Sequence, residues 1–192
     1  MIVAHKNPFR MSCIEAIPYQ FLQADMHTLM QRFQAHQYRG VLVGPHGSGK
    51  TTLREQIERA LRQAGMVVHP IVISGDDRVS WTYVQDHLHQ VNPQAVISID
   101  GIDRFNPLLW WRFQRAMRHQ RGILATSHVV GRLPLLHLHA TTPELLMFAV
   151  RSLTDEHDHF TKDHCRTLFE RHHGNIRDCL RELYDTWPAY HQ

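Results

Sequence analysis

Short apolar runs alternate with stretches of helical spacing through most of the chain. The runs predict strands at residues 41–43, 67–73, 95–99, 123–126 and 135–138. Apolar residues three or four positions apart predict helices at residues 50–63, 79–90 and 107–119. Strands that alternate with helices in this way form parallel sheets covered on both faces. We therefore expect an α/β fold, a three-layer core with a parallel sheet of about five strands.

Both ends of the chain lack this alternation. Near the start, a helix is predicted at residues 25–37, with one apolar face made by Met26, Leu29, Met30 and Phe33. After Pro143 the strand pattern stops, and helices are predicted at residues 144–153, 161–172 and 175–185. We accordingly divide the chain into a lead-in with its helix (residues 1–39), the α/β core (residues 40–142) and a small C-terminal helical lid (residues 143–192).

Composition narrows the class of protein without naming its function. The 192 residues are 43% hydrophobic and 20% charged, as in soluble globular proteins. The sequence shows neither an apolar run of about 20 residues that would cross a bilayer nor a signal peptide. Cys13, Cys165 and Cys179 have no CxxC spacing, which favours a reducing compartment. We expect a cytoplasmic protein with no membrane partner, and a net charge of +3 does not by itself indicate nucleic-acid binding.

A glycine-rich segment follows the first predicted strand and opens a helix. Gly44-Pro45-His46-Gly47-Ser48-Gly49-Lys50-Thr51 matches the P-loop pattern G-x-x-x-x-G-K-[ST]. In such a loop the backbone N–H groups and the helix dipole bind phosphate oxygens, the lysine reaches the β- and γ-phosphates, and the threonine hydroxyl ligates Mg²⁺. We add Thr52, the next helical residue, and expect the Lys50 side chain to face solvent before a nucleotide binds. The alternative, a chance glycine-rich turn, fits the order of strand, loop and helix poorly.

A carboxylate follows a second buried strand about fifty residues later. Asp100 ends the strand at residues 95–99, and ligands of open α/β sheets bind at the carboxyl ends of the strands. It is therefore a candidate to hold Mg²⁺ opposite Thr51, the Walker B role, unless it only caps a loop. We expect the strand at residues 123–126 to lie between these two strands in the sheet. Its end, Thr126-Ser127-His128, would then lie beside the γ-phosphate.

With these residues in place, the sequence resembles the P-loop NTPases of the additional-strand (ASCE) division, specifically AAA+ and STAND-type ATPases, over about residues 7–185. Ile99-Asp100-Gly101-Ile102-Asp103-Arg104 is similar to the Walker B segment of KAP-type P-loop NTPases. Asn7-Pro8-Phe9 is similar to the stretch that packs on adenine in such ATPases. The sequence also looks like small bacterial ATP-binding proteins with the same P-loop and an aspartate-glycine Walker B, a likeness that supplies no activity.

The resemblance implies roles for two arginines. Arg177, within Gly174-Asn175-Ile176-Arg177-Asp178, resembles the sensor 2 arginine of AAA+ lids, which reaches back to the bound nucleotide. Arg132 lies where AAA+ proteins often carry an arginine finger for the neighbouring subunit. The alternatives are a surface salt bridge for Arg177 and an ordinary loop arginine for Arg132.

One position departs from the family pattern. Many ATPases of this division carry Glu or Asp directly after the Walker B aspartate to orient the attacking water, and this chain has Gly101. Asp103 is a candidate substitute if the strand end turns tightly. His128 is another, because a neutral imidazole can hold a water near the γ-phosphate. Nucleotide binding is thus better supported than fast turnover.

Two further patterns have competing explanations. Residues 107–121 combine Trp110 and Trp111 with four arginines (Arg112, Arg115, Arg118 and Arg121). They could contact nucleic-acid phosphates or an acidic partner, but we favour an amphipathic helix that buries Leu109, Phe113 and Met117 and leaves the arginines in solvent. Histidine pairs at 137/139, 157/159 and 172/173 suggest zinc, yet strand alternation or helix exposure explains them without a metal.

The leading hypothesis is an ATP- and Mg²⁺-dependent hydrolase that acts as a conformational switch on a protein partner or on its own assembly. One alternative is a P-loop kinase, in which Asp76-Asp77-Arg78 would bind the hydroxyl of a small substrate. Another is a nucleotide-binding scaffold with little hydrolysis, suggested by Gly101.

Overall fold

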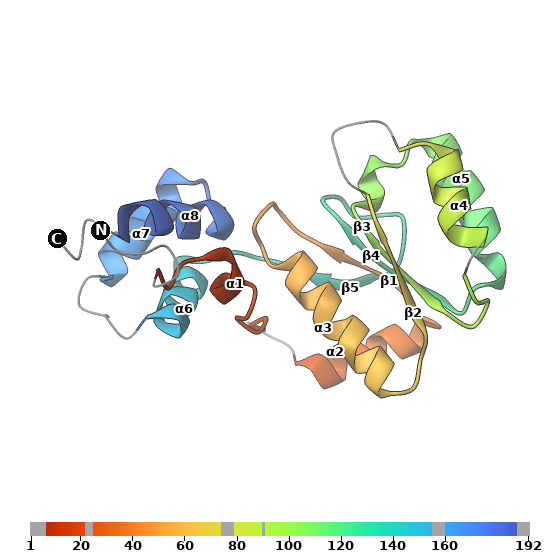
Figure 1. The fold of residues 1–192 in the computed structure, drawn as a ribbon, viewed down its shortest axis with the longest axis horizontal. Helices are drawn as coiled ribbons and strands as arrows, with labels where there is room; N and C mark the ends of the chain where they lie inside the picture. The colour runs from red at the N-terminus through yellow and green to blue at the C-terminus, as the bar shows by residue number, and fades with distance from the viewer. Residues whose placement is uncertain (1–6, 22–24, 74–78, 90, 155–159, 188–192) are drawn as a thin grey trace. The chain divides into compact units, whose positions relative to one another are not determined.

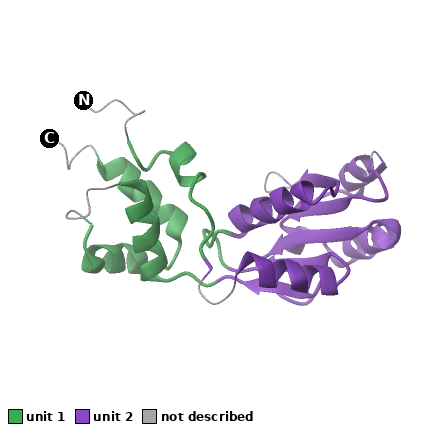
Figure 2. Ribbon diagram, turned by 90° about the horizontal axis from the view of Figure 1, so that it is seen from below, with its two compact units in different colours: residues 1–20, 45–49, 140–192 green, residues 21–44, 50–139 purple. Residues whose placement is uncertain are grey.

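The computed structural model describes residues 7–21, 25–73, 79–89, 91–154 and 160–187. The chain forms two compact units, coloured separately in Figure 2. The sheet unit contains residues 21–44 and 50–139, and the helical unit contains residues 1–20, 45–49 and 140–192. This division differs from the boundaries expected after residues 39 and 142, because the lead-in is shared between the units and the middle of the glycine-rich loop groups with the C-terminal helices.

The sheet unit holds five parallel strands in the order β2-β3-β4-β1-β5. The strands are β1 (Arg39–Val43), β2 (Val68–Val72), β3 (Val96–Asp100), β4 (Gly122–Ser127) and β5 (Leu135–Leu138). The fold class expected from the sequence is thus confirmed. So is the position of β4 between β1 and β3, which brings the ends of all three strands to one edge of the sheet.

Helices cover both faces of this sheet, as Figure 1 shows. One face carries α2 (Met26–Ala35) and α3 (Lys50–Gln63), and the other carries α4 (Trp81–His89) and α5 (Pro107–Ala116). Two short 3-10 helices flank α5, namely η2 (Ile102–Arg104) and η3 (Met117–His119). The sequence pattern had predicted one helix through residue 119, and the structure ends the α-helix at Ala116 and tightens the last turn.

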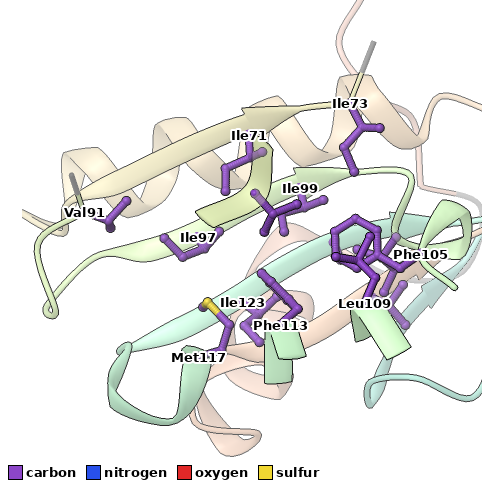
Figure 3. Close-up of a cluster of buried hydrophobic side chains, with 14 of the residues drawn as sticks. Ile71, Ile73, Val91, Ile97, Ile99, Phe105, Leu109, Phe113, Met117 and Ile123 are labelled. Atoms are coloured by element: carbon purple, nitrogen blue, oxygen red, sulfur yellow. The ribbon is translucent and has the colours of Figure 1, made fainter. Parts of the chain in front are cut away.

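Strand alternation decides which side chains meet which helices. Ile97 and Ile99 of β3 pack with Phe113 of α5 in the cluster drawn in Figure 3. Ser98, between them, faces α3 instead. Leu109, Phe113 and Met117 are all buried, so the amphipathic interpretation of this segment is confirmed for its inner face.

A buried polar network joins α3 to β3. Arg54, Glu58 and Ser98 are at most 5% exposed. The Arg54 guanidinium pairs with the Glu58 carboxylate and donates to Ser98 Oγ at 3.1 Å, while Ser98 Oγ donates to Glu58 Oε1 at 2.6 Å. Arg62, at the margin, donates to the other Glu58 oxygen at 3.1 Å. The buried charges of Arg54 and Glu58 are therefore paired with each other, as buried charges require, while Arg54 Nε has no hydrogen-bond partner within the described residues.

The helical unit contains α1 (Met11–Ile14), α6 (Pro143–Leu153), α7 (Lys162–Arg171) and α8 (Ile176–Thr186). The last three begin at polar caps: Thr142, Thr161 and Asn175 each accept a hydrogen bond from a backbone N–H three residues on. The short α1 was missed, because four residues cannot show a helical period. Within the described residues, no helix is long and apolar enough to cross a membrane.

Removing one member of the buried network should cost more than removing two. Glu58→Leu leaves the Arg54 guanidinium buried without its carboxylate, and we expect a loss of about 3–5 kcal/mol in unfolding free energy. The double variant Arg54→Met/Glu58→Leu should lose less than Glu58→Leu alone, because no unpaired charge remains inside. Urea denaturation measures both. Arg62→Met, which removes only the half-exposed arginine, serves as the control and should cost at most about 1 kcal/mol; a double variant that is the least stable of all would contradict the assignment.

Candidate functional site

The candidate site lies in the sheet unit where β1, β3 and β4 end. Gly44 follows β1, Asp100 ends β3 and Ser127 ends β4. The Gly44 N–H donates to the Ser127 carbonyl at 3.3 Å, which ties the start of the glycine-rich loop to the end of β4. Helix α3 begins at Lys50, so the loop leads from a buried strand directly into a helix N-terminus. Such a terminus presents unpaired N–H groups and positive dipole charge to an anion.

Thr51 and Asp100 are brought together as the sequence predicted. Thr51 Oγ1 donates to Asp100 Oδ2 at 3.3 Å. Thr126, on the strand between them, donates to the other oxygen, Asp100 Oδ1, and accepts a hydrogen bond from the Gly101 N–H at 2.8 Å. Hydroxyl and carboxylate oxygens are the ligands that Mg²⁺ takes, and Mg²⁺ keeps several waters beside one or two protein ligands. These side chains therefore fit a magnesium ion.

The sequence led us to expect a solvent-facing Lys50 side chain, and the structure shows it buried instead. It is 8% exposed, and its Nζ donates to the Gly44 carbonyl at 2.8 Å across the loop. The physical reason is that a loop of this tight curvature places a carbonyl within reach of the ammonium, which gains a charge-assisted hydrogen bond. The ammonium is thus already aimed at the interior of the loop.

Gly101 makes the turn that follows β3. Its φ of 81° lies in the left-handed region, which a residue with a side chain adopts at a cost of about 1–2 kcal/mol. The turn leads at once into η2, which carries Asp103. Glycine therefore allows the chain to reverse tightly at the position where many ATPases of the division that the sequence resembles carry an acidic side chain.

Asp103 and His128, the two candidates for orienting a water, contact each other. Asp103 Oδ2 lies 3.0 Å from His128 Nδ1. Burial alone would raise the pKa of Asp103, but the hydrogen bond and charge of His128 outweigh it and leave that pKa below its ordinary value. The carboxylate is therefore ionised at neutral pH. Its other oxygen, Oδ1, is buried and has no hydrogen-bond partner within the described residues.

Arg132 is engaged within its own chain. Its guanidinium donates to the Ile102 carbonyl at 2.5 Å and to the Phe105 carbonyl, and it lies 5.4 Å from the centre of the Trp110 ring. These bonds hold the segment that contains η2. A finger role for Arg132 stays a prediction, and it would require these bonds to be given up.

Within the helical unit, the middle of the glycine-rich loop is covered by α8. A Cβ on Gly47, whose φ is 68°, would lie 1.9 Å from Asn175 Oδ1 and 3.0 Å from the Arg177 backbone nitrogen. The first turn of α8 therefore packs directly on Gly47, and only a glycine fits there. The Arg177 side chain is exposed in that first turn. Its contact with a nucleotide stays a prediction.

Other loop residues differ in exposure. Pro45 and His46 are exposed, while Ser48 is 3% exposed and donates to the Pro45 carbonyl at 2.8 Å. The Tyr19 ring, which the sequence analysis missed, lies 3.1 Å from where a Cβ on Gly49 would be. Burial raises the pKa of the Tyr19 hydroxyl. The only local signal for Tyr19 was its position in the lead-in that the resemblance placed near the nucleotide.

Phe9 is found inside the core of the helical unit. It is 1% exposed and contacts Phe160 and Trp187 edge to face, at 5.6 and 5.4 Å between ring centres. Its ring is therefore not presented for stacking on a base. The half-buried Pro8 remains for the adenine contact, which stays a prediction.

Several sequence candidates lie elsewhere. Asp76-Asp77-Arg78, proposed for a kinase substrate, and the pair His157/His159 fall outside the described residues. His137 and His139 meet edge to face at 4.8 Å, and His172 Nε2 lies 2.6 Å from Glu182 Oε2. Over the ranges that the structure describes, no group of three or more histidine, cysteine or acidic side chains is placed to hold a metal ion.

Comparison with solved structures places the fold among known ones. A variant of RuvB from Thermotoga maritima superposes with a TM-score of 0.58 at 20% identity, over 83% of this chain and 60% of the RuvB chain. The Thermotoga maritima structure described as the RuvB Holliday junction branch migration motor gives 0.52 at 17% identity, over 84% and 61%. The chain spans about three fifths of the length of these structures. At this identity the likeness shows the fold alone. No protein-family model matches the sequence, and no curated protein matches it.

Thr126→Val tests the side chain that joins Asp100 to Gly101. Valine keeps the shape but leaves the Gly101 N–H without an acceptor, so we expect a loss of about 1–3 kcal/mol in unfolding free energy. Ser127→Ala is the matched control on the same strand, because its hydroxyl bonds only within the turn to Val129, and it should cost about 0.5–1.5 kcal/mol. Thermal or urea unfolding of both variants measures these losses. Wild-type stability of Thr126→Val would show that Thr126 does not hold the turn at Gly101.

Proposed function

We propose that the protein binds ATP with Mg²⁺ and hydrolyses it, and that this reaction drives a conformational switch. The observation that carries the proposal is the contact of Thr51 with Asp100 at 3.3 Å, at the edge where a P-loop opens α3. One cluster thereby combines a phosphate-binding loop with a metal-binding pair. A site that only bound phosphate would not need the paired hydroxyl and carboxylate.

The loop and Lys50 would bind the triphosphate. Backbone N–H groups of the loop and the start of α3 point at phosphate oxygens, and the Lys50 ammonium leaves the Gly44 carbonyl for the β- and γ-phosphates. Thr51 and Asp100 would hold Mg²⁺, which neutralises charge that develops on the transferred phosphoryl group. Thr126 keeps Asp100 oriented through its hydrogen bond.

The Asp103–His128 pair is our candidate for positioning the attacking water in place of the residue missing at Gly101. When the imidazole carries its proton on Nδ1, it donates to the ionised Asp103 carboxylate. That bond fixes the ring and leaves Nε2 as the nitrogen that accepts a hydrogen bond from water. The arrangement is that of a base held by an acid, used in many hydrolytic sites.

Arg177 is our candidate for reporting the presence of the γ-phosphate. It is exposed in the first turn of α8, whose backbone packs on Gly47 of the loop. Only a triphosphate offers the outer negative charge that would hold this arginine, so ATP and ADP would stabilise different states of the helical unit. The output would reach a protein partner or further copies of the chain. A solved structure with the same fold is described as a branch migration motor, which is consistent with a switch of this kind.

Two substitutions separate binding from hydrolysis. Lys50→Ala should weaken ATP binding by at least about tenfold, since a charge-assisted contact is lost. Asp100→Asn should keep part of the binding and lose Mg²⁺-dependent turnover. Calorimetry and phosphate release, with ATP and GTP in parallel, measure the two steps. Lys162→Ala, an exposed lysine at the start of α7, is the control and should behave as wild type.

The phosphate-release assay also tests whether the Asp103–His128 pair positions the attacking water, and whether the protein is instead a scaffold that binds ATP without hydrolysing it. His128→Gln should slow turnover while ATP affinity stays within about twofold. Unchanged turnover in this variant would remove His128 from the reaction. Wild-type protein that binds ATP tightly and releases no phosphate would instead favour the scaffold, and a folded Lys50→Ala with unchanged affinity would overturn the nucleotide site.

Arg177→Ala should discriminate between the two nucleotides. A charge-assisted contact to the γ-phosphate contributes about 1.5–3 kcal/mol, so ATP should bind about 10- to 150-fold more weakly and ADP almost unchanged. Arg181→Ala, one turn further along α8 and also exposed, is the matched control and should alter neither. Hydrogen exchange over residues 143–187 gives the second measurement. Equal protection with ATP and ADP would leave Arg177 as an ordinary surface residue.

A further inference from the structure

One segment supplies the whole basic excess of the chain. From Arg104 to Pro143 there are six arginines and neither Asp nor Glu. The other residues carry 15 basic against 18 acidic side chains. Such local asymmetry creates a positive surface that the modest net charge of the whole chain conceals.

Three of the six arginines have structural partners. Arg104 donates to the Ile73 carbonyl at 2.9 Å, Arg132 donates to two carbonyls, and Arg121 lies 5.4 Å from the centre of the Tyr38 ring. The other three, Arg112, Arg115 and Arg118, are exposed on α5 and η3. Among the residues that the structure describes, the side chains of these three arginines form no ion pair or hydrogen bond. Their charge is therefore available to a ligand.

The outer face of α5 also exposes apolar side chains. Leu108 is 59% exposed and Trp111 is 57% exposed. At helical spacing both lie on the same side as Arg112 and Arg115, opposite the buried Leu109, Phe113 and Met117. Two large apolar side chains thus share one exposed helix face with the arginines, and exposed apolar groups that gather in this way mark interaction surfaces more often than single ones do.

A groove continues this face toward α4. It has a volume of about 500 Å³ and is lined by Trp81, Arg112, Arg115 and Ala116. Trp81 is half-buried, packs on the core of the sheet unit and presents part of its ring to the groove. The acidic residue of α4, Asp86, lies five positions from Trp81, or about 7.5 Å along the helix. The groove thus combines two guanidinium groups with an indole ring.

We propose that this face, defined by Trp81, Leu108, Trp111, Arg112, Arg115 and Arg118, binds single-stranded nucleic acid. Arginines would contact successive phosphates, and unpaired bases would stack on the two tryptophan rings. A duplex offers phosphates but keeps its bases stacked on one another, so it would use only part of the face. An acidic peptide would satisfy the charges and leave the exposed rings without a role. The proposal does not depend on the nucleotide site.

The test mixes the full chain, free of ATP and ADP, with a fluorescent 12-nucleotide oligothymidylate. Binding is measured by the fluorescence anisotropy of the oligonucleotide at salt concentrations from 50 to 200 mM. We expect a dissociation constant on the order of 10⁻⁶ to 10⁻⁴ M at physiological salt. Arg112→Gln/Arg115→Gln should weaken binding and reduce the slope of log affinity against log salt by about 1.4, since each contact with a single strand contributes about 0.7. Trp111→Ala, at an exposed position that leaves the core intact, should weaken binding about 5- to 150-fold.

Arg59→Gln/Arg181→Gln is the matched control. It removes the same charge from exposed positions on α3 and α8 and should bind almost as wild type does. Oligouridylate should bind like oligothymidylate, because both offer the same phosphates and unpaired pyrimidine bases. The proposal would be overturned by no binding at 50 mM salt, by equal loss in the test and control pairs, or by an oligoglutamate of equal charge that competes as well as the oligonucleotide. Tight binding of duplex with no effect of Trp111→Ala would also overturn it, since stacking would then play no part.

Discussion

The alignment of α3 with β3 is the constraint on which the candidate site depends. Ser98 and Asp100 lie two residues apart on β3, so their side chains point to the same face of the sheet. Thr51 and Arg54 lie three apart on α3 and share a face of that helix. The two elements are consequently joined twice, by Thr51 with Asp100 at the edge of the sheet and by Arg54 with Ser98 beneath it. The contact of Arg54 with Ser98 fixes how far α3 can slide along β3, and with it the distance between Thr51 and Asp100, the two proposed magnesium ligands.

The local sequence pattern was sufficient to predict the strands, most helices and the fold class. It did not predict the side-chain contacts between elements. Alternation of apolar runs predicted the strands, and the motif with its flanking elements placed Thr51 beside Asp100, because parallel strands end at a common edge. Burial of Arg54 and Glu58 was not foreseen, since charges four apart on a helix are usually solvated. The inward position of Lys50 and the packing of Asn175 on Gly47 depend on partners that local spacing does not reveal.

The segment after β3 connects the two surfaces for which we propose functions. Asp100 ends the strand, Asp103 lies in η2, and α5 with its exposed arginines begins at Pro107. Arg132 donates to carbonyls at both ends of the intervening turn, which makes that turn a braced unit and not a free linker. Residues 102–105 thus form a short, hydrogen-bonded connection between Asp100, our proposed magnesium ligand, and the start of α5.

During synthesis, we expect the helical unit to fold later than the sheet unit. Asn7 donates to the Tyr184 carbonyl at 2.8 Å, across 177 positions of sequence. Contacts of such separation form late, because a long loop must close before they gain anything. The five strands leave the ribosome before α6, α7 and α8 do, so they can pair while the partners of the helical unit are still missing. Gly47 would then stay uncovered on the nascent chain until Asn175 has been synthesised, so the glycine-rich loop would be among the last parts of the protein to reach its final packing.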